Sequence, residues 1–365
     1  MEVLITVLSV TAIATLLATL IVIADKFLNN YGKCTIDINE GNKKLEVEGG
    51  QSLLSSLAAN KIFIPSACGG KATCGLCKVK VIEGAGPLLP TEEPYLSDQE
   101  RNDGVRLSCQ VKIKKNINIQ IPEEYFNIKQ FSASVVSITD MTHDIKEFRF
   151  KMDDPDTIDF KAGQYMQIET KPYAKIKEKA IRAYSISSLP SDNGFIDLIV
   201  RKVPGGICTT YMHDYLKVGD QVSMTGPQGE FYRRDDSDSY VFMAGGSGLA
   251  PIKSIIMDII EKGLDREMFF FFGAVTKSDL YYVDIFKELE KKYPKFKYIP
   301  ALSKPLPEDH WEGETGLVTD VMLKYVKSGE GKHAYLCGSP GMIGACIKAL
   351  TGVNFQVEKI YYDKF

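Results

Sequence analysis

The first part of the chain is a long apolar run that no later segment repeats. From Val3 to Ala24 there is no charged residue, and most positions hold Leu, Ile, Val, Ala or Thr. As a helix this run would reach about 33 Å, which is enough to cross a lipid bilayer once. The pattern therefore predicts one transmembrane helix, within a membrane anchor at residues 1–30.

The residues around the apolar run favour an uncleaved anchor. A cleaved signal peptide begins with positive charge and ends at a small-residue cleavage site, whereas here Glu2 precedes the run. A buried helix of a soluble domain is the other alternative, but at this length polar residues would interrupt it. Lys26 and Lys33 follow the run and no Lys or Arg precedes it, so the positive-inside rule places the rest of the chain in the cytoplasm.

After the anchor, the pattern becomes that of a small domain over residues 31–126. Residues 35–38 and 44–47 alternate apolar and polar side chains on either side of a Glu-Gly-Asn turn, which predicts a β-hairpin. Ser52 precedes the stretch from Leu53 to Ala59 and is a suitable N-cap. We therefore expect a hairpin followed by a short helix.

The last two segments differ in the secondary structure that their patterns predict. Residues 127–234 contain short β-rich runs separated by turn residues, which predicts an antiparallel β-barrel. In residues 235–365, apolar strands such as Tyr240–Ala244 alternate with helical stretches such as Ile252–Ile260, which predicts an α/β domain with an open parallel sheet. Further strands are expected at 268–274, 296–301 and 333–336, and a further helix at 282–291.

Composition narrows the classes of function. The chain has 365 residues, 44% of them hydrophobic, so it is neither disordered nor collagen-like and is long enough for about two or three domains. Its 44 Lys and Arg against 47 Asp and Glu give a net charge of −3, and nucleic acid is therefore not an expected partner. Eight cysteines are too few for a secreted disulfide scaffold of this length.

Four of the cysteines have a spacing suited to a metal centre. Cys68, Cys74 and Cys77 form a C-x5-C-x2-C loop with glycines between them, and Cys109 follows later. Glycines let the backbone wrap closely and point N–H groups at sulfur, which stabilises a negatively charged iron–sulfur cluster. Zinc is the main alternative, although all-cysteine zinc sites usually use two C-x2-C pairs. Structural cysteines without a metal are the other alternative.

Further motifs contain residues suited to bind dinucleotides. Arg182-Ala183-Tyr184-Ser185 lies in the expected barrel and is followed by Gly205–Thr210 and Thr225–Phe231. Gly245–Pro251 stands between an expected strand and an expected helix, an arrangement that binds pyrophosphate at the helix N-terminus. Each motif alone is weak evidence, because an arginine in a strand is often a surface charge and glycine with proline often marks a turn.

Taken in order, these motifs resemble the F subunit of the sodium-translocating NADH:quinone reductase, within the ferredoxin–NADP reductase superfamily. The resemblance rests on the cysteine loop with Arg106–Val111, on Arg182–Ser185 and on Gly245–Pro251. Cys337–Met342 is similar to the C-G-P-P-x-M of the superfamily, with Ser339 at the first proline. The resemblance implies a β-grasp [2Fe–2S] ferredoxin domain, a β-barrel FAD domain and an α/β NADH domain.

The resemblance also implies roles for individual residues, with Ser185 and Cys337 as the catalytic ones. The expected cluster ligands are Cys68, Cys74, Cys77 and Cys109. The expected FAD contacts are Arg182 at the pyrophosphate, Ala183, Tyr184 on the ring, Ser185 near N5, Gly206, Cys208 and Thr209 at the phosphates, and Phe365 over the flavin face. The expected NADH contacts are Gly245, Gly246, Gly248, Pro251, Asp279 at the adenosine ribose, and Cys337 beside nicotinamide C4.

The predicted function is that of a single-pass protein of the bacterial inner membrane, with soluble domains facing the cytoplasm. It passes hydride from NADH to FAD, then single electrons through the [2Fe–2S] cluster to membrane partner subunits and finally quinone. The span from Val3 to Ala24 contains no carboxylate, so Na+ export would belong to the partners. The reductase component of an oxygenase and a non-catalytic redox-sensing membrane module are the alternatives. NADPH is the alternative donor, since Lys277 lies near Asp279.

Overall fold

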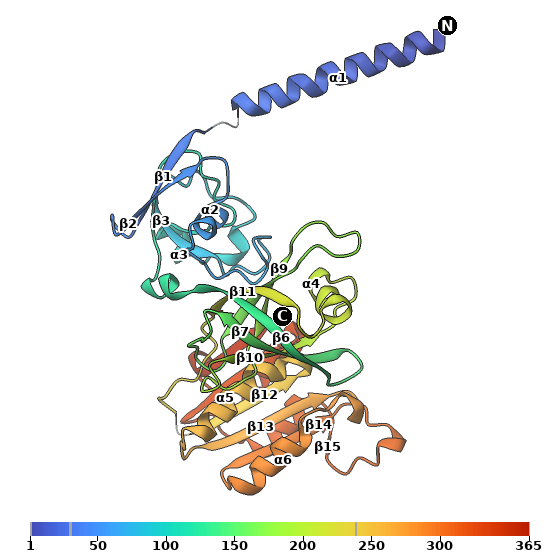
Figure 1. Cartoon of the computed structure of the whole chain (residues 1–365). Helices are drawn as coiled ribbons and strands as arrows, with labels where there is room; N and C mark the ends of the chain where they lie inside the picture. The colour runs from blue at the N-terminus through green and yellow to red at the C-terminus, as the bar shows by residue number, and fades with distance from the viewer. Residues whose placement is uncertain (1, 29–30, 238, 365) are drawn as a thin grey trace. The chain divides into compact units, whose positions relative to one another are not determined.

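The computed structural model describes residues 2–28, 31–237 and 239–364 of the chain. The chain divides into two compact units, Met1–Asn127 and Ile128–Phe365. The first is coloured blue to blue-green in Figure 1, and the second runs from green to red. The predicted division of the second unit near residue 234 stays a prediction.

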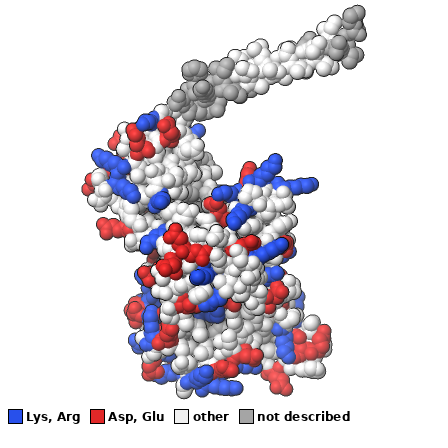
Figure 2. Space-filling view, in the orientation of Figure 1, with Lys and Arg blue, Asp and Glu red and all other residues white. Residues whose placement is uncertain are grey.

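The first unit begins with the helix α1, Glu2–Leu28. The described part of α1 shows no charged side chain in the space-filling view (Figure 2), and its large apolar side chains from Ile5 to Leu20 are 53–61% exposed where they are described. Within the described ranges, no helix has both the length and the apolar character needed to cross a membrane. Residues 1, 29 and 30 of the predicted anchor lie outside the described residues.

The rest of the first unit is a mixed five-stranded sheet with the helix α2 packed on it. The strand order is β2-β1-β5-β3-β4, with β1 and β5 parallel and the other pairs antiparallel. The strands are β1 Lys33–Ile38, β2 Lys43–Glu48, β3 Lys78–Glu83, β4 Val105–Leu107 and β5 Ile117–Gln120, and the helices are α2 Leu53–Ala59 and α3 Asp98–Asn102. This is the mixed sheet with a packed helix that the expected β-grasp fold requires.

The predicted hairpin and capped helix of this unit are confirmed. β1 pairs with β2 from Lys33 opposite Glu48 to Ile38 opposite Lys43. Ser52 caps α2, and its side chain accepts a hydrogen bond from Ser55 N–H at 3.1 Å. Leu53 and Leu57 on α2 are fully buried against the apolar face of the sheet, because three or four residues along a helix return to the same face.

The second unit starts with a six-stranded antiparallel sheet of order β10-β7-β6-β11-β8-β9. The edge strands β9 and β10 meet at an isolated bridge between Ile186 and Leu198, and Ser187 N–H donates to Asp197 O at 2.8 Å. The predicted barrel is therefore nearly closed, with a bridge in place of a full ladder at the seam. The strands are β6 Lys129–Asp140, β7 Ile145–Asp154, β8 Tyr165–Glu169, β9 Ile181–Ser185, β10 Phe195–Arg201 and β11 Gln221–Gln228, and the short helix α4 is Ile207–Thr210.

The second unit ends with the predicted parallel sheet, whose order is β15-β14-β13-β12-β16-β17. Apolar side chains fill both faces of β12, as in a sheet covered by helices on both sides. The strand order reverses at β12, between β13 and β16, and ligands of open α/β sheets bind at such a point. The strands are β12 Ser239–Gly245, β13 Glu267–Ala274, β14 Phe296–Leu302, β15 Glu314–Thr315, β16 Lys332–Gly338 and β17 Ile360–Lys364, and the helices are α5 Leu249–Glu261, α6 Val283–Lys292, α7 Val318–Tyr325 and α8 Pro340–Gly352.

Candidate cofactor and nucleotide sites

The four grouped cysteines of the first unit lie as two pairs of sulfurs. The Sγ atoms of Cys68 and Cys74 are 3.4 Å apart, and the thiol of Cys77 hydrogen-bonds that of Cys109. Within each pair, the hydrogen bond lowers the pKa of one thiol, Cys68 or Cys109, and raises the pKa of the other. The two sulfurs of each pair therefore interact directly with each other.

The donor set fits a cluster with two irons, each held by two thiolates. Across the described residues, no three or more His, Cys, Asp or Glu side chains are arranged to hold one metal ion. The loop requires glycine at Gly75, where φ is +68° and an added Cβ would lie 2.5 Å from the ring of Tyr95. Gln110 Nε2 donates to Cys109 Sγ at 3.7 Å, so one sulfur already has a polar partner.

A buried ion pair fixes the segment that carries the fourth cysteine. Arg106, two residues into β4, donates to both carboxylate oxygens of Glu92, at 3.0 and 2.5 Å, and Glu92 is fully buried. The same guanidinium donates to the carbonyls of Gly86 and Pro87, and Leu107 N–H donates to Glu92 at 2.9 Å. This pair therefore ties the loop before Glu92 to the strand that ends just before the fourth cysteine. Arg106 belongs to a motif predicted from the sequence, whereas Glu92 was not among the predicted site residues.

The expected FAD residues of β9 lie on the strand beside β8. Tyr184 is opposite Met166 and Ser185 is opposite Tyr165 in the antiparallel register. The hydroxyl of Tyr184 faces the thiol of Cys208, and burial raises the pKa of Tyr184. The β9 and α4 motifs, about twenty residues apart in the chain, are thus brought together in space.

The glycine turn before α4 is tightly built. An added Cβ at Gly206 would lie 2.6 Å from Thr209 Oγ1, so glycine is needed there. Thr209 Oγ1 accepts a hydrogen bond from Val203 N–H at 3.1 Å. The hydroxyl that we expect to contact a phosphate therefore already has a backbone partner. Tyr173 Oη donates to Ile207 O at 2.7 Å and holds the first residue of α4 in place.

The second glycine turn lies at the reversal point of the parallel sheet. Gly245 ends β12, and the 3-10 turn Gly246–Gly248 leads into α5. An added Cβ at Gly248 would lie 2.2 Å from the carbonyl oxygen of Cys337 at the end of β16. The start of α5 therefore packs directly on the strand that carries Cys337, and Pro251 is buried in the first turn of α5.

Cys337 is fully buried where the two halves of the second unit meet. Burial raises the pKa of its thiol, and the carboxylate of Asp363 acts in the same direction, so the thiol stays protonated at neutral pH. Asp363 is opposite Cys337 in the β16–β17 register, and Ser185 Oγ donates to Asp363 Oδ2 at 3.4 Å. Asp363 is a site residue that was not predicted from the sequence, although it lies close to Phe365. Phe365 lies outside the described residues.

Asp279 has local partners. Its Oδ2 accepts hydrogen bonds from Thr276 N–H at 2.9 Å and Thr276 Oγ1 at 3.0 Å, which caps a 3-10 turn at Lys277–Asp279. Its other oxygen lies 3.7 Å from His143 Nδ1, in the turn between β6 and β7. The turn follows β13, at the carboxyl edge of the parallel sheet.

Three family models match successive parts of the chain. The 2Fe-2S iron-sulfur cluster binding domain matches residues 36–114, the oxidoreductase FAD-binding domain 132–232 and the oxidoreductase NAD-binding domain 242–348. The chain is 37% identical over 396 positions to the F subunit of the Na(+)-translocating NADH-quinone reductase of Actinobacillus succinogenes, covering 97% of each chain. It is 36% identical over 405 positions to that of Neisseria meningitidis, covering 100% of each.

Solved structures of similar architecture cover most of the chain. A cytochrome P450 reductase from Amycolatopsis is 28% identical, with a TM-score of 0.74, over 91% of this chain and 98% of that one. A ferredoxin reductase in carbazole 1,9a-dioxygenase is 25% identical, with a TM-score of 0.70 and the same coverage. Both matches include parts of the two compact units.

Proposed function

The chain belongs to the family of the F subunit of the Na(+)-translocating NADH-quinone reductase, and from this premise we propose that it oxidises NADH through FAD and a [2Fe–2S] cluster within a membrane complex. The observation that carries the proposal is the meeting of Ser185, Asp363 and Cys337 at the junction of the two sheets of the second unit. When bound, FAD supplies two-electron uptake from the nicotinamide and one-electron release to the cluster.

The residues of the junction have separate tasks in this proposal. Ser185 and Cys337 border the place where flavin and nicotinamide would meet. The Ser185 hydroxyl donates to Asp363, which leaves its oxygen as a hydrogen-bond acceptor, and Cys337 is a neutral, buried thiol that shapes the ring site. Asp363 holds Ser185 in position by accepting its hydroxyl proton in a hydrogen bond. The buried thiol excludes water from this edge, and it forms no covalent bond in the reaction.

The remaining residues bind the two dinucleotides. For FAD, Arg182 would contact the pyrophosphate and Tyr184 the ring, with Ala183 between them, while the backbone N–H groups from Gly206 to Thr209 would receive the phosphates. Phe365 would cover the flavin. For NADH, the turn Gly245–Gly248 would receive the pyrophosphate and Asp279 the adenosine ribose.

The four cysteines are proposed as the cluster ligands, two thiolates to each iron, in the pairs that the sulfur positions form. Cys109 is held in place by the segment that Arg106 and Glu92 fix. The cluster would pass single electrons to membrane partner subunits and finally quinone, and Na+ export would belong to those partners.

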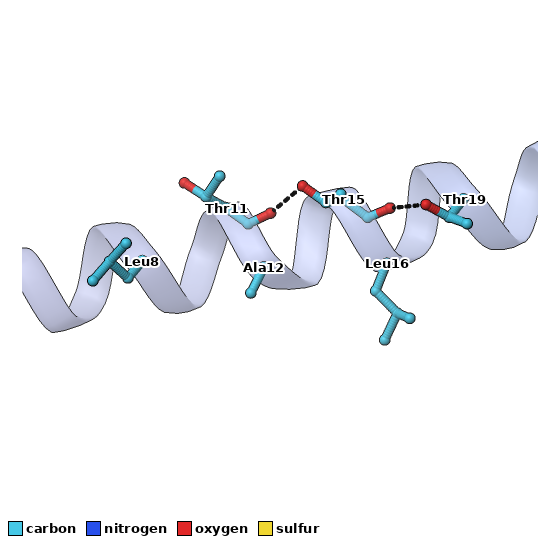
Figure 3. A pocket seen from close by; sticks show the side chains of 6 residues that line it. All are labelled: Leu8, Thr11, Ala12, Thr15, Leu16 and Thr19. Carbon is cyan, nitrogen blue, oxygen red and sulfur yellow. Dashed lines mark hydrogen bonds between the residues drawn. The ribbon is translucent and has the colours of Figure 1, made fainter.

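We propose that α1 is a single-pass anchor in the bacterial inner membrane, with the rest of the chain in the cytoplasm. The sequence supports this proposal, because the uncharged run from Val3 to Ala24 would extend about 33 Å at about 1.5 Å per residue. The hydroxyls of Thr11, Thr15 and Thr19 each donate to the carbonyl four residues earlier, at 2.7–2.8 Å, so these hydroxyls are satisfied within the helix. Figure 3 shows the bonds of Thr15 and Thr19. Carbonate-washed membranes should retain the full chain, and replacing Leu8 and Leu16 by Lys should release it.

The experiment for the proposed reaction is an anaerobic visible spectrum of the detergent-purified full chain, taken before and after NADH and, separately, NADPH. We expect flavin bands over broad iron–sulfur absorption, bleached quickly by NADH and slowly by NADPH. A colourless protein, or flavin that NADH does not bleach, would refute the proposal.

One alternative has a specific observation in its favour. The two solved structures that cover 91% of the chain are described as a cytochrome P450 reductase and as a ferredoxin reductase in a dioxygenase. The chemistry up to the cluster would be the same in such a reductase, and the acceptor would differ. Purification of the full chain together with integral membrane subunits would favour the quinone reductase, and purification with a soluble oxygenase would favour the alternative.

A further inference from the structure

A buried tyrosine holds the glycine turn that follows β12. Tyr281 Oη donates to the carbonyl oxygen of Gly246 at 2.8 Å. Tyr281 is 5% exposed, and its ring packs edge-on against Phe272 of β13 at a centroid distance of 5.5 Å. Burial raises the pKa of its hydroxyl, which therefore remains a donor. Tyr281 lies outside every motif proposed to bind FAD or NADH.

The hydrogen bond fixes one peptide plane of the turn. In a trans peptide the carbonyl and the N–H point in opposite directions. With the Gly246 carbonyl held toward Tyr281 in the core, the N–H of Ser247 points away from that core. Gly246 has φ of +56°, and a glycine has the freedom to rotate this plane unless another group restrains it. The Gly246 carbonyl also accepts from Leu249 N–H, which continues into α5.

The tyrosine is itself held by its neighbour. Tyr282 Oη donates to Glu147 Oε1 of β7 at 2.5 Å, and Lys253 Nζ of α5 lies 3.5 Å from the same oxygen. Lys253 also lies over the Tyr282 ring, 4.6 Å from its centroid. The pair Tyr281–Tyr282 thus connects the glycine turn on one side to the antiparallel sheet on the other.

We propose that Tyr281 is a positioning residue that orients the Gly246–Ser247 peptide so that its N–H receives the pyrophosphate of NADH. The inference rests on the proposed function, because it assigns the pyrophosphate to this turn. Tyr281 does not touch the nucleotide, and it acts through the backbone. Its hydroxyl keeps the turn in the binding orientation before NADH arrives, so that binding does not have to order the turn.

The test compares Tyr281→Phe with Tyr298→Phe in the full-length, FAD-loaded protein. Tyr298 is a matched control because it is also 5% exposed and packs on Phe270, while its hydroxyl has no hydrogen-bond partner among the described residues. Steady-state kinetics give KM and kcat with NADH and an artificial electron acceptor. Calorimetry gives the Kd of ADP-ribose, which carries the pyrophosphate without the nicotinamide.

We expect Tyr281→Phe to raise both KM and the Kd of ADP-ribose by about fivefold, the factor typical of one lost neutral hydrogen bond, with kcat within about twofold of wild type. Tyr298→Phe should leave all of these unchanged. A Tyr281→Phe protein with wild-type KM and Kd, or an equal rise in the control, would overturn the inference.

The outcomes also separate this inference from the proposed function. If the wild-type protein neither binds nor oxidises NADH, the proposed function fails and the inference fails with it. If the wild type oxidises NADH and Tyr281→Phe behaves identically, only the inference fails. Should Tyr281→Phe not fold, hydrogen–deuterium exchange of the Ser247 amide in the wild type tests the inference: exchange that ADP-ribose does not slow would overturn it.

Discussion

Ser185 and Asp363 are 178 residues apart in the chain and are joined by a hydrogen bond, Oγ to Oδ2 at 3.4 Å. Ser185 ends a strand of the antiparallel sheet and Asp363 lies on the edge strand of the parallel sheet, opposite Cys337. The contact therefore joins the two sheets at the place where hydride would pass. A serine that is already oriented loses little freedom when the flavin is reduced.

Replacing Asp363 tests that relationship. We expect Asp363→Asn to lower kcat for NADH oxidation by about one to two orders of magnitude, because the group that orients the serine no longer carries charge. FAD content and the KM for NADH should change little. Asp236→Asn is the control, since Asp236 is an exposed carboxylate paired with Lys359. Equal kinetics in Asp363→Asn and wild type would contradict the assignment.

We expect the buried ion pair of Arg106 and Glu92 to stabilise the ferredoxin domain. Glu92→Gln leaves the guanidinium, 7% exposed, without its counter-charge, and we expect a loss of about 3–5 kcal/mol in unfolding free energy. Denaturant unfolding, followed with cluster absorbance, measures this loss. A double variant, Glu92→Met with Arg106→Met, removes both charges and should be more stable than Glu92→Gln. A single variant as stable as wild type would show that the pair does not fix this segment.

Asp279 offers a test of the preference for NADH. If its carboxylate receives the ribose hydroxyls, Asp279→Asn should lower kcat/KM for NADH by about tenfold and change kcat/KM for NADPH much less. Asp309→Asn is the matched control, because Asp309 also accepts backbone N–H groups at a 3-10 turn. If Asp279 serves purely as a cap, the ratio of the two efficiencies will stay constant while both variants lose stability.

Because His333 is buried, we expect the unfolding free energy of the protein to depend on pH. His333 is 2% exposed, neither ring nitrogen has a hydrogen-bond partner in the described part of the chain, and burial lowers its pKa. Asp236 opposes this shift, and the nearby Lys359 and Arg234 add to it. Because the unfolded state binds the proton more tightly, the unfolding free energy should fall as pH drops below about 6.5.

Chemical denaturation of His333→Phe between pH 8 and pH 5, about the range in which histidine titrates, checks this expectation. The substitution should flatten the decline in unfolding free energy. His143→Gln is the control, since the side chain of His143 is 70% exposed. A decline of the same slope in wild type and His333→Phe would show that another group causes it.

The sequence predicts those parts of the structure that depend on neighbouring residues. The Ser52 cap of α2 and the glycine turn between β12 and α5 follow from local chemistry, and the structure has both. The order of the parallel sheet and the contact of Gly248 with Cys337 depend on packing between distant segments. Periodicity does not fix such pairings, which is why Ser185 and Cys337 could be named only through resemblance.

The functional residues that could not be identified from the sequence have one property in common. Asp363, Glu92 and Tyr281 each act on a partner far along the chain, and none belongs to a glycine or cysteine motif. A carboxylate in a short tail and a tyrosine before a helix have many roles in proteins. An acid next to a stretch rich in leucine and proline, as at Glu92, is the signal that could have drawn attention to a buried pair.

Electron flow from NADH through FAD to the cluster can be measured by anaerobic titration of the full-length, FAD-loaded and iron-loaded protein with NADH. The wild type is compared with Cys109→Ser and with Cys346→Ser as a control, since Cys346 is a buried cysteine outside the cluster loop. We predict that wild type and Cys346→Ser take up one electron more than Cys109→Ser, with matching loss of iron–sulfur absorbance, while flavin is reduced at the same rate in all three. Equal electron uptake by Cys109→Ser and wild type, or flavin that NADH does not reduce, would contradict this electron path.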